Sequence, residues 1–132
     1  MMISSRGRYA LRVMIDLAGC EGHTPLKDIA ARQELSLKYL ESIMTILSKA
    51  GLVEGSHGRG GGYRLRRPPE NYTVAEILSL TEGGISAVGC KGSTGCDNAS
   101  NCPTRPMWER LDTLVHSFFN GITLAQLMNG EV

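Results

Sequence analysis

The sequence predicts a mainly helical α+β fold, and three features lead to this prediction. Apolar residues recur every three or four positions along several stretches, which is the spacing of amphipathic helices. Two short segments with strand-like composition flank a single glycine-rich run, as the strands of a β-hairpin do. The chain has 132 residues, a length typical of one domain or of a small domain with an appendage.

The first two helices are expected in the N-terminal part of the chain. Along residues 9–18 the apolar side chains fall on one side of a helix, and Arg12 and Asp16 fall on the other. Thr24 and Pro25 then predict the start of a short second helix, with the threonine as N-cap and the proline at the first helical position. Both helices are expected to bury one face.

A third helix is expected after a short connection. Ser36 predicts its N-cap and Gly51 its end. Its expected buried positions step by three and four residues, and they are Leu37, Leu40, Met44 and Leu47. Because the opposite face is polar and the connection is short, the second and third helices together predict a helix-turn-helix.

A basic hairpin is expected next. Residues 52–54 and 63–66 have the composition of strands, and residues 55–62 between them are rich in glycine, with His57 and Arg59 near the tip. The glycine run is not a nucleotide-binding P-loop, since Tyr63 and Arg64 stand where that motif needs lysine and serine or threonine. A helix-turn-helix followed by a basic hairpin predicts a winged helix, whose tip can bring a cation into a narrow minor groove of DNA.

The candidate partner is therefore a double-stranded DNA operator. The third helix is expected to enter the major groove, with Glu41 as the specificity residue because a carboxylate accepts from cytosine N4. Basic residues outside this helix are expected to contact phosphates. The full set of expected DNA-contacting residues is Arg6, Arg8, Ser36, Lys38, Tyr39, Glu41, Ser42, Thr45, His57, Arg59, Gly60 and Arg64.

The charge distribution agrees with this assignment. The formal net charge is only +1, but residues 1–67 carry eleven Lys and Arg against six Asp and Glu. Residues 68–132 carry three against seven. We therefore divide the chain into a DNA-binding winged helix-turn-helix, 1–67, and a C-terminal region, 68–132, that does not meet the polyanion.

The C-terminal region is expected to hold a long dimerisation helix. Before it, Thr73 and Glu76 predict a capping box, and Tyr72 with Ile77 a hydrophobic staple, for a helix that ends at about Leu80. Thr104 is expected to cap the long helix, whose apolar stripe is Met107, Leu111, Leu114, Val115, Phe118 and Ile122. A capping box is expected to restart a last helical turn at residues 123–126. The stripe favours a homodimer, with packing on the chain's own winged helix as the alternative.

Between these helices lies a segment with cysteines at every sixth position, Cys90, Cys96 and Cys102. The residues among them are small or polar and cannot form a core. Without the paired C-x-x-C motifs of structural zinc sites, the spacing favours an iron–sulfur cluster over zinc. Cys20 falls in an apolar helical pattern and is expected to be a core residue.

Other features exclude several classes of protein. No secretory leader and no apolar run of about twenty residues is present, so we expect a cytoplasmic protein without a membrane partner. No catalytic constellation is recognisable, so we expect neither an enzyme nor a small-molecule substrate. Two alternatives stay open: a cluster-free regulator whose thiols respond to oxidation or bind zinc, and an iron–sulfur electron carrier, which would have little use for a wing.

Several motifs occur in the order in which one bacterial family carries them: residues 5–12, 36–41, 58–63, the cysteine triad and 120–124. By these motifs, over nearly the whole chain, the sequence resembles the Rrf2 family of winged-helix regulators, and most of all its cluster-binding members. The resemblance implies a homodimeric DNA-binding repressor or activator that carries a 2Fe–2S cluster and controls cluster-assembly genes. Relatives in the family sense nitric oxide, iron or cysteine status, some with 4Fe–4S clusters and some with none.

Two positions depart from the pattern of the cluster-binding members. Those members have Leu-Thr-His after the third cysteine, and the histidine is the fourth cluster ligand. Here Arg105 stands at that position, and a guanidinium has no lone pair to offer. Another branch uses a carboxylate near the start of the partner's first helix, where this chain has Arg8. The fourth ligand is thus left open among Asp97, Asn98, Asn101, Thr104 and water.

Overall fold

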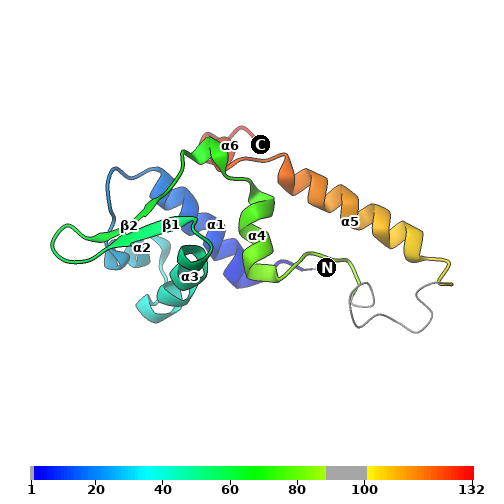
Figure 1. Ribbon diagram of the computed structural model, residues 1–132, viewed down its shortest axis with the longest axis horizontal. Coiled ribbons are helices and arrows are strands. Elements are labelled where there is room, and N and C mark those ends of the chain that lie inside the picture. Colours follow the sequence, from blue (N-terminus) through cyan, green and yellow to red (C-terminus); the bar gives the residue numbers. More distant parts are fainter. Residues whose placement is uncertain (1, 89–100) are drawn as a thin grey trace.

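The computed structural model describes residues 2–88 and 101–132 (Figure 1). Its helices and strands are α1 (Ser5–Ala18), α2 (Leu26–Gln33), α3 (Leu37–Lys49), β1 (Val53–Ser56), β2 (Gly62–Leu65), the 3-10 turn η1 (Pro69–Asn71), α4 (Val74–Glu82), α5 (Arg105–Asn120) and α6 (Leu124–Met128). This order confirms the mainly helical winged-helix prediction. No helix in the described ranges is long and apolar enough to cross a bilayer.

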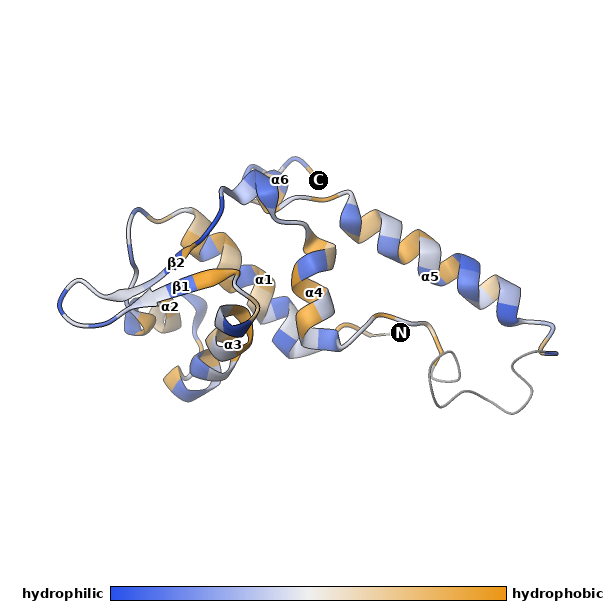
Figure 2. Cartoon of the chain, viewed as in Figure 1, coloured by the Kyte–Doolittle hydropathy of each residue, from blue (hydrophilic) through white to orange (hydrophobic). Residues whose placement is uncertain are grey.

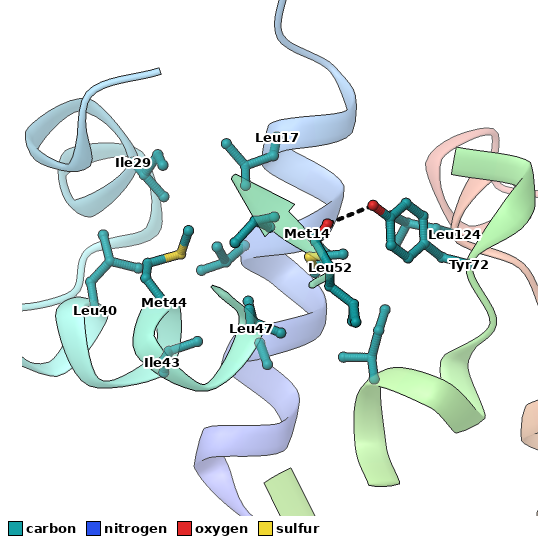
Figure 3. Packing of buried hydrophobic residues seen from close by; sticks show 14 of the residues in the cluster. Met14, Leu17, Ile29, Leu40, Ile43, Met44, Leu47, Leu52, Tyr72 and Leu124 are labelled. Atoms are coloured by element: carbon teal, nitrogen blue, oxygen red, sulfur yellow. Dashed lines mark hydrogen bonds between the residues drawn. The ribbon is translucent and has the colours of Figure 1, made fainter. Parts of the chain in front are cut away.

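The core forms around α1, with buried side chains of the other elements gathered along it (Figure 3). Val13 and Met14 of α1 are fully buried against apolar residues of the other helices. The α3 contribution is Leu40, Ile43, Met44 and Leu47. The expected burial of Leu37 was wrong: it lies in the first turn of α3 and is 46% exposed, whereas Ile43 faces the core.

Residues from the C-terminal half belong to the same core. Tyr72, Ile77 and Leu124 are fully buried in one cluster with the side chains of α1 and α3. The hydroxyl of Tyr72 donates to the carbonyl oxygen of Leu52 over 2.5 Å (Figure 3). The division at residue 67 is thus a proposal about function, since a single core extends across it.

The start of α2 differs from the prediction. The helix begins at Leu26 with Pro25 at the N-cap position, and no side chain caps it. Thr24 is instead buried and pairs with β2, since its N–H donates to the carbonyl of Tyr63 over 2.8 Å and its carbonyl accepts from the Tyr63 N–H over 2.9 Å. The predicted N-cap role of Thr24 was therefore wrong, since the residue is placed by its backbone pairing with β2 and the helix begins one residue later than predicted.

Glycine at position 62 makes this pairing feasible. Gly62 has a φ of 145°, and a Cβ placed on it would overlap with the backbone of Thr24 and Pro25. β2 pairs with β1 in antiparallel register, with Val53 opposite Leu65. The base of the wing is therefore fastened on both edges of β2.

Polar contacts fix α2 against α1. Asp16 has a side chain only 5% exposed, and its carboxylate accepts from the Arg32 guanidinium at 2.6 Å and from Gln33 Nε2 at 2.8 Å. Cys20 lies beside this pair, half-buried, with its thiol donating to the carbonyl of Asp16. The prediction that Cys20 is a core residue was therefore wrong, because it follows the last turn of α1.

The capping predictions for the C-terminal helices have mixed outcomes. Thr73 accepts from the N–H of Glu76 as predicted, but the Glu76 carboxylate pairs with Arg67 at 2.7 Å, which leaves the capping box of α4 half formed. The capping box of α6, between Thr123 and Gln126, is confirmed in full. Both helix starts are joined by a bridge between Thr73 and Thr123.

The long helix α5 extends away from the body of the molecule (Figure 1). Thr104 occupies its N-cap position, but with αR backbone angles and no capping hydrogen bond, so the predicted cap was wrong. At its middle, Asp112 accepts from the Ala87 N–H over 2.8 Å and from the Ser86 hydroxyl over 3.1 Å. These contacts hold the segment after α4 against α5.

Candidate DNA interface and cysteine segment

The outer face of α3 presents the predicted recognition residues together. Ser36 caps the helix by accepting from the Tyr39 N–H over 3.1 Å. The exposed side chains of the face are Ser36, Lys38, Glu41, Ser42 and Thr45. The apolar residues on the opposite side hold the helix by burial, so this polar face stays in solvent. It has the dimensions and chemistry of a helix that enters a major groove.

Two hydroxyls on this face are oriented by the helix itself. Ser42 Oγ donates to the carbonyl of Tyr39 over 2.6 Å, and Thr45 Oγ1 donates to the carbonyl of Glu41 over 2.8 Å. Because each hydroxyl has used its hydrogen, it presents acceptor lone pairs outward. Together with the Glu41 carboxylate, they make this part of α3 a surface of acceptors.

Tyr39 differs from the other predicted contacts because it is half-buried. Its ring packs edge-on against Tyr9 of α1, with centroids 5.9 Å apart. Arg12 lies 5.2 Å from the Tyr9 ring centroid and donates to Gln33 over 3.0 Å. Arg12 is an additional interface candidate that was not among the predicted contacts; it is exposed, and its spacing of four places it on the same helix face as Arg8.

The wing tip presents two exposed cationic or titratable side chains, His57 and Arg59. The tip closes by a hydrogen bond from the Gly61 N–H to the carbonyl of Gly58. Gly60 has a φ of 78°, a left-handed conformation that explains glycine there. The wing points away from α5, at the other end of the molecule (Figure 1).

Arg64 is already engaged within the wing. It lies opposite Glu54 in the sheet register and donates to the Glu54 carboxylate, while Arg66 approaches the other oxygen at 3.8 Å. The hydrogen bond from Arg64 holds the pKa of Glu54 below its usual value. Arg64 is still half exposed, so it combines a cross-strand pair with an outward cationic face.

The remaining predicted contacts are at the start of α1. Arg6 and Arg8 are both exposed, and Arg8 donates to the hydroxyl of Ser5 over 3.2 Å. They therefore form a cationic patch separate in sequence from α3 and the wing.

Of the three cysteines, Cys90 and Cys96 lie outside the described residues, as do Asp97 and Asn98. Cys102 is described, and it lies three residues before α5. Its sulfur is 3.2 Å from Thr104 Oγ1. This hydrogen bond, with backbone N–H groups of the coming helix, lowers the pKa of Cys102 and favours the thiolate that binds metals. Cys102 thus has the chemistry of a cluster ligand.

No described side chain near Cys102 completes a four-ligand set. Arg105 donates to Glu109 over 2.8 Å and is unsuited to ligate. His116 lies eleven residues further along α5, about 16 Å at 1.5 Å per residue, too far for the same chain to use it. Within residues 2–88 and 101–132 no group of three potential metal ligands is assembled. Thr104 Oγ1, 3.2 Å from the Cys102 sulfur, is an oxygen donor close to this thiol.

Most of the predicted apolar stripe of α5 is uncovered; Val115 is half-buried, and Ile122, also half-buried, lies beyond the end of the helix. None of the side chains of α5 is buried, and Figure 2 shows apolar residues recurring along the free helix. Met107 is 53% exposed, Leu114 65% and Phe118 61%. Trp108, the only tryptophan, is half-buried near the start of the helix. Isolated apolar residues on a surface are ordinary, but a stripe along one helix face marks an interaction surface.

The fold and the exposed polar face of α3 define a DNA-binding transcriptional regulator of the winged helix-turn-helix class. A family model described as an iron-dependent transcriptional regulator matches residues 3–130. The chain therefore belongs to the Rrf2 family, which confirms the resemblance inferred from the sequence. The relatives that it matches are transcriptional regulators rather than enzymes, as predicted.

Individual relatives are similar over nearly the whole chain. The HTH-type transcriptional regulator IscR of Aliivibrio salmonicida is 42% identical over 130 residues, 97% of this chain and 77% of the relative. IscR of Yersinia pseudotuberculosis is 38% identical over 133 residues, 99% of this chain and 81% of the relative.

Solved structures agree on the fold. IscR of T. potens superposes with a TM-score of 0.79 at 34% identity, covering 100% of this chain and 89% of that one. CymR, the global cysteine regulator of B. subtilis, superposes with a TM-score of 0.80 at 37% identity, covering 98% and 97%. The fold is thus shared by regulators with different names.

Proposed function

We propose that this protein is a homodimeric repressor that binds an operator through α3 and the wing, and that senses iron–sulfur cluster status. The observation that supports DNA binding is the polar outer face of α3, which faces solvent because the opposite face is buried. Glu41 reads a base in the major groove, while Arg6, Arg8, His57 and Arg59 neutralise phosphates. The wing tip follows the minor groove.

Cluster sensing is assigned to Cys90, Cys96 and Cys102, with a 2Fe–2S cluster as the proposed cofactor. Cys102 supports it through its lowered pKa and its position before α5. When bound, the cluster supplies a redox-active, oxidisable centre. Three thiolates with one weak fourth ligand make it easy to lose, which suits a sensor of cluster supply. Cluster-biogenesis genes are the proposed targets.

Dimerisation is assigned to the apolar stripe of α5. Met107, Leu114 and Phe118 are spaced by seven and four residues and lie on one exposed face. A second copy of the same helix can bury them in a two-fold symmetric interface. A dimer would then present two α3 helices to the two halves of a palindromic operator.

A second candidate is a cluster-free regulator that responds through its thiols. The specific observation in its favour is Arg105, which stands at the family's histidine position and is paired with Glu109. The likeness to CymR, described as a cysteine regulator, also fits it. Both candidates share the DNA interface and differ only in what the cysteines bind.

The deciding experiment is anaerobic purification followed by visible absorbance and by iron, sulfide and zinc analysis. The cluster proposal expects a brown protein with about two irons and two sulfides per subunit, and loss of colour in Cys102→Ala but not in the control Cys20→Ala. A colourless protein that contains zinc, or no metal, would support the second candidate.

The DNA assignment is tested separately by selecting sites from a random duplex library. Glu41→Ala is expected to relax base preference at one position of each half-site, while total affinity changes little. If wild type and Glu41→Ala return the same consensus, Glu41 does not read a base.

A further inference from the structure

At the start of α1, the side chain that accepts from the N–H of the N-cap residue comes from another helix. In an ordinary capping box the residue at N3 is Glu or Gln, and its side chain accepts from the N–H of the N-cap residue. In α1 the N-cap is Ser4 and the N3 position is Gly7, which has no side chain. The acceptor is Glu82, the last residue of α4: its Oε1 accepts from both the N–H and the hydroxyl of Ser4, each over 2.8 Å.

The glycine is what allows this carboxylate to approach. Gly7 is buried, and a Cβ placed on it would overlap with Glu82 Oε1 and lie 3.1 Å from Thr81 Oγ1. The N–H of Gly7 in turn donates to Ser4 Oγ over 3.1 Å. A chain of hydrogen bonds therefore runs from Glu82 through Ser4 to Gly7, and it brings a negative charge to a helix N-terminus, where it is favourable.

The position of Gly7 determines where its neighbours point. Successive residues of an α-helix are about 100° apart, so Arg6 and Arg8 project on either side of the line that joins Gly7 to Glu82. Both are exposed, whereas Gly7 is buried. Fixing the first turn of α1 on α4 thus fixes the directions of both arginines.

We infer that Glu82 is a positioning residue for DNA binding, which holds Arg6 and Arg8 in place for the phosphate backbone. The inference rests on the proposed function, since it assumes that these arginines contact DNA. It also gives the C-terminal region an indirect part in DNA binding, through a carboxylate that never touches DNA.

The positioning role of Glu82 can be tested by filter binding to operator duplex at several salt concentrations, because it predicts the opposite change in affinity from simple electrostatics. Electrostatics alone predicts that removal of a negative charge strengthens DNA binding. Glu82→Ala is instead expected to weaken binding by about three- to tenfold and to lower the salt slope by about one, because each lost phosphate contact removes about 0.9. Glu131→Ala removes the same charge at an exposed site and is expected to leave affinity equal or slightly higher.

Two further variants separate positioning from folding. Glu82→Gln keeps an acceptor for Ser4 and is expected to keep most of the affinity. Gly7→Ala improves helix propensity but displaces the carboxylate, so it is expected to weaken binding as Glu82→Ala does. Circular dichroism melting shows whether each variant is folded at the temperature of the binding assay.

A mutant cycle that combines Glu82→Ala with the double variant Arg6→Ala/Arg8→Ala tests whether Glu82 acts through these two arginines. In that background Glu82→Ala is expected to cause no further loss of affinity or slope. An equal loss in both backgrounds, or no loss in either, would overturn the inference while the proposed interface stands. If the double arginine variant itself binds like wild type, the proposed α1 contacts are wrong, and the inference falls with them.

Discussion

The hydroxyl of Tyr72 donates to the carbonyl oxygen of Leu52, and this hydrogen bond of 2.5 Å fastens the chain after the wing to the chain before it. The phenol oxygen of Tyr72 also accepts from the backbone N–H groups of Arg66 and Arg67, at 3.0 and 3.1 Å. The side chain of Tyr72 is fully buried. A single phenol therefore satisfies three backbone groups at the base of the hairpin.

Tyr72→Phe is expected to lower the free energy of unfolding by about 1–3 kcal/mol, because it removes the hydrogen bonds of a buried phenol to three backbone groups. Urea denaturation followed by circular dichroism measures the change. Tyr63→Phe, at a half-exposed tyrosine on β2, is the control and should change it by less than about 0.5 kcal/mol. Equal effects of the two substitutions would mean that the Tyr72 hydroxyl is not structural.

Gly62→Ala is expected to separate β2 from Thr24. The new Cβ would overlap with the Thr24 backbone at a φ that alanine rarely adopts, so a loss of stability of about 2–3 kcal/mol is expected. Operator affinity should fall as well, since the wing loses its support. Gly19→Ala is the control, because Gly19 has a φ of −86° and room for a methyl group. Thermal melting and filter binding distinguish the two variants.

Asp16→Asn is expected to destabilise the protein by about 1–2 kcal/mol at neutral pH, since it removes charge-assisted hydrogen bonds from Arg32 and Gln33. Burial by itself raises the pKa of Asp16, but the Arg32 and Gln33 hydrogen bonds and the Arg32 charge outweigh it and hold the pKa below its usual value. The measurement is urea denaturation, with Glu21→Gln at an exposed carboxylate as the control.

The ion pair between Asp16 and Arg32 predicts how the stability of the protein depends on pH. Because the pKa of Asp16 is lower in the folded protein than in the unfolded chain, its contribution is fully present above the unfolded value of about 4. It is lost as the pH falls through the folded pKa. The stability difference between wild type and Asp16→Asn should be constant from about pH 5 to 8 and should shrink below about pH 4. A difference that grows on acidification would contradict this sign.

Leu114→Asp is expected to produce a folded monomer. The side chain is 65% exposed on α5, so a charge there has little effect on the core and blocks burial against a second copy. Sedimentation measures the mass, and operator binding should weaken by at least tenfold when the two half-sites are bound separately. Thr113→Asp, next along the helix but off the apolar stripe, should remain a dimer. An unchanged mass for Leu114→Asp would place the dimer interface elsewhere.

Arg105→His is expected to slow cluster loss in air. It places an imidazole where the cluster-binding relatives carry one, and it breaks only an exposed pair with Glu109 worth about 0.5 kcal/mol or less. The decay of visible absorbance gives the rate, with Arg110→His as the control on the same helix. Identical decay in wild type and Arg105→His would show that position 105 does not reach the cluster.

The helices and the hairpin were predictable because their signals are local. Ser36 stands at a strong capping position and accepts the expected hydrogen bond, and the α6 capping box formed as predicted. Local signals failed where a distant segment engaged the same residue. Thr24 pairs with β2 instead of capping α2, and Glu76 pairs with Arg67 instead of completing its box.

In the candidate DNA interface, the polar face of α3 could be predicted from the sequence, but the contacts between distant residues could not. The polar positions of α3 follow from its helical period, whereas the half-burial of Tyr39 depends on Tyr9, thirty residues away in the sequence. The link between Ser4 and Glu82 spans seventy-eight residues and leaves no periodic trace. A side chain that acts through tertiary contact has no local pattern by which to find it.

Trp108, the only tryptophan of the chain, lies half-buried near the start of α5, six residues after Cys102. Its intrinsic fluorescence therefore originates less than two helical turns after the proposed cluster ligand in sequence, on the helix proposed to dimerise. A nearby iron–sulfur chromophore absorbs in the range of indole emission and quenches it. We therefore expect the emission intensity of Trp108 to rise when the proposed cluster is lost, and its emission wavelength to shift when the proposed dimer dissociates.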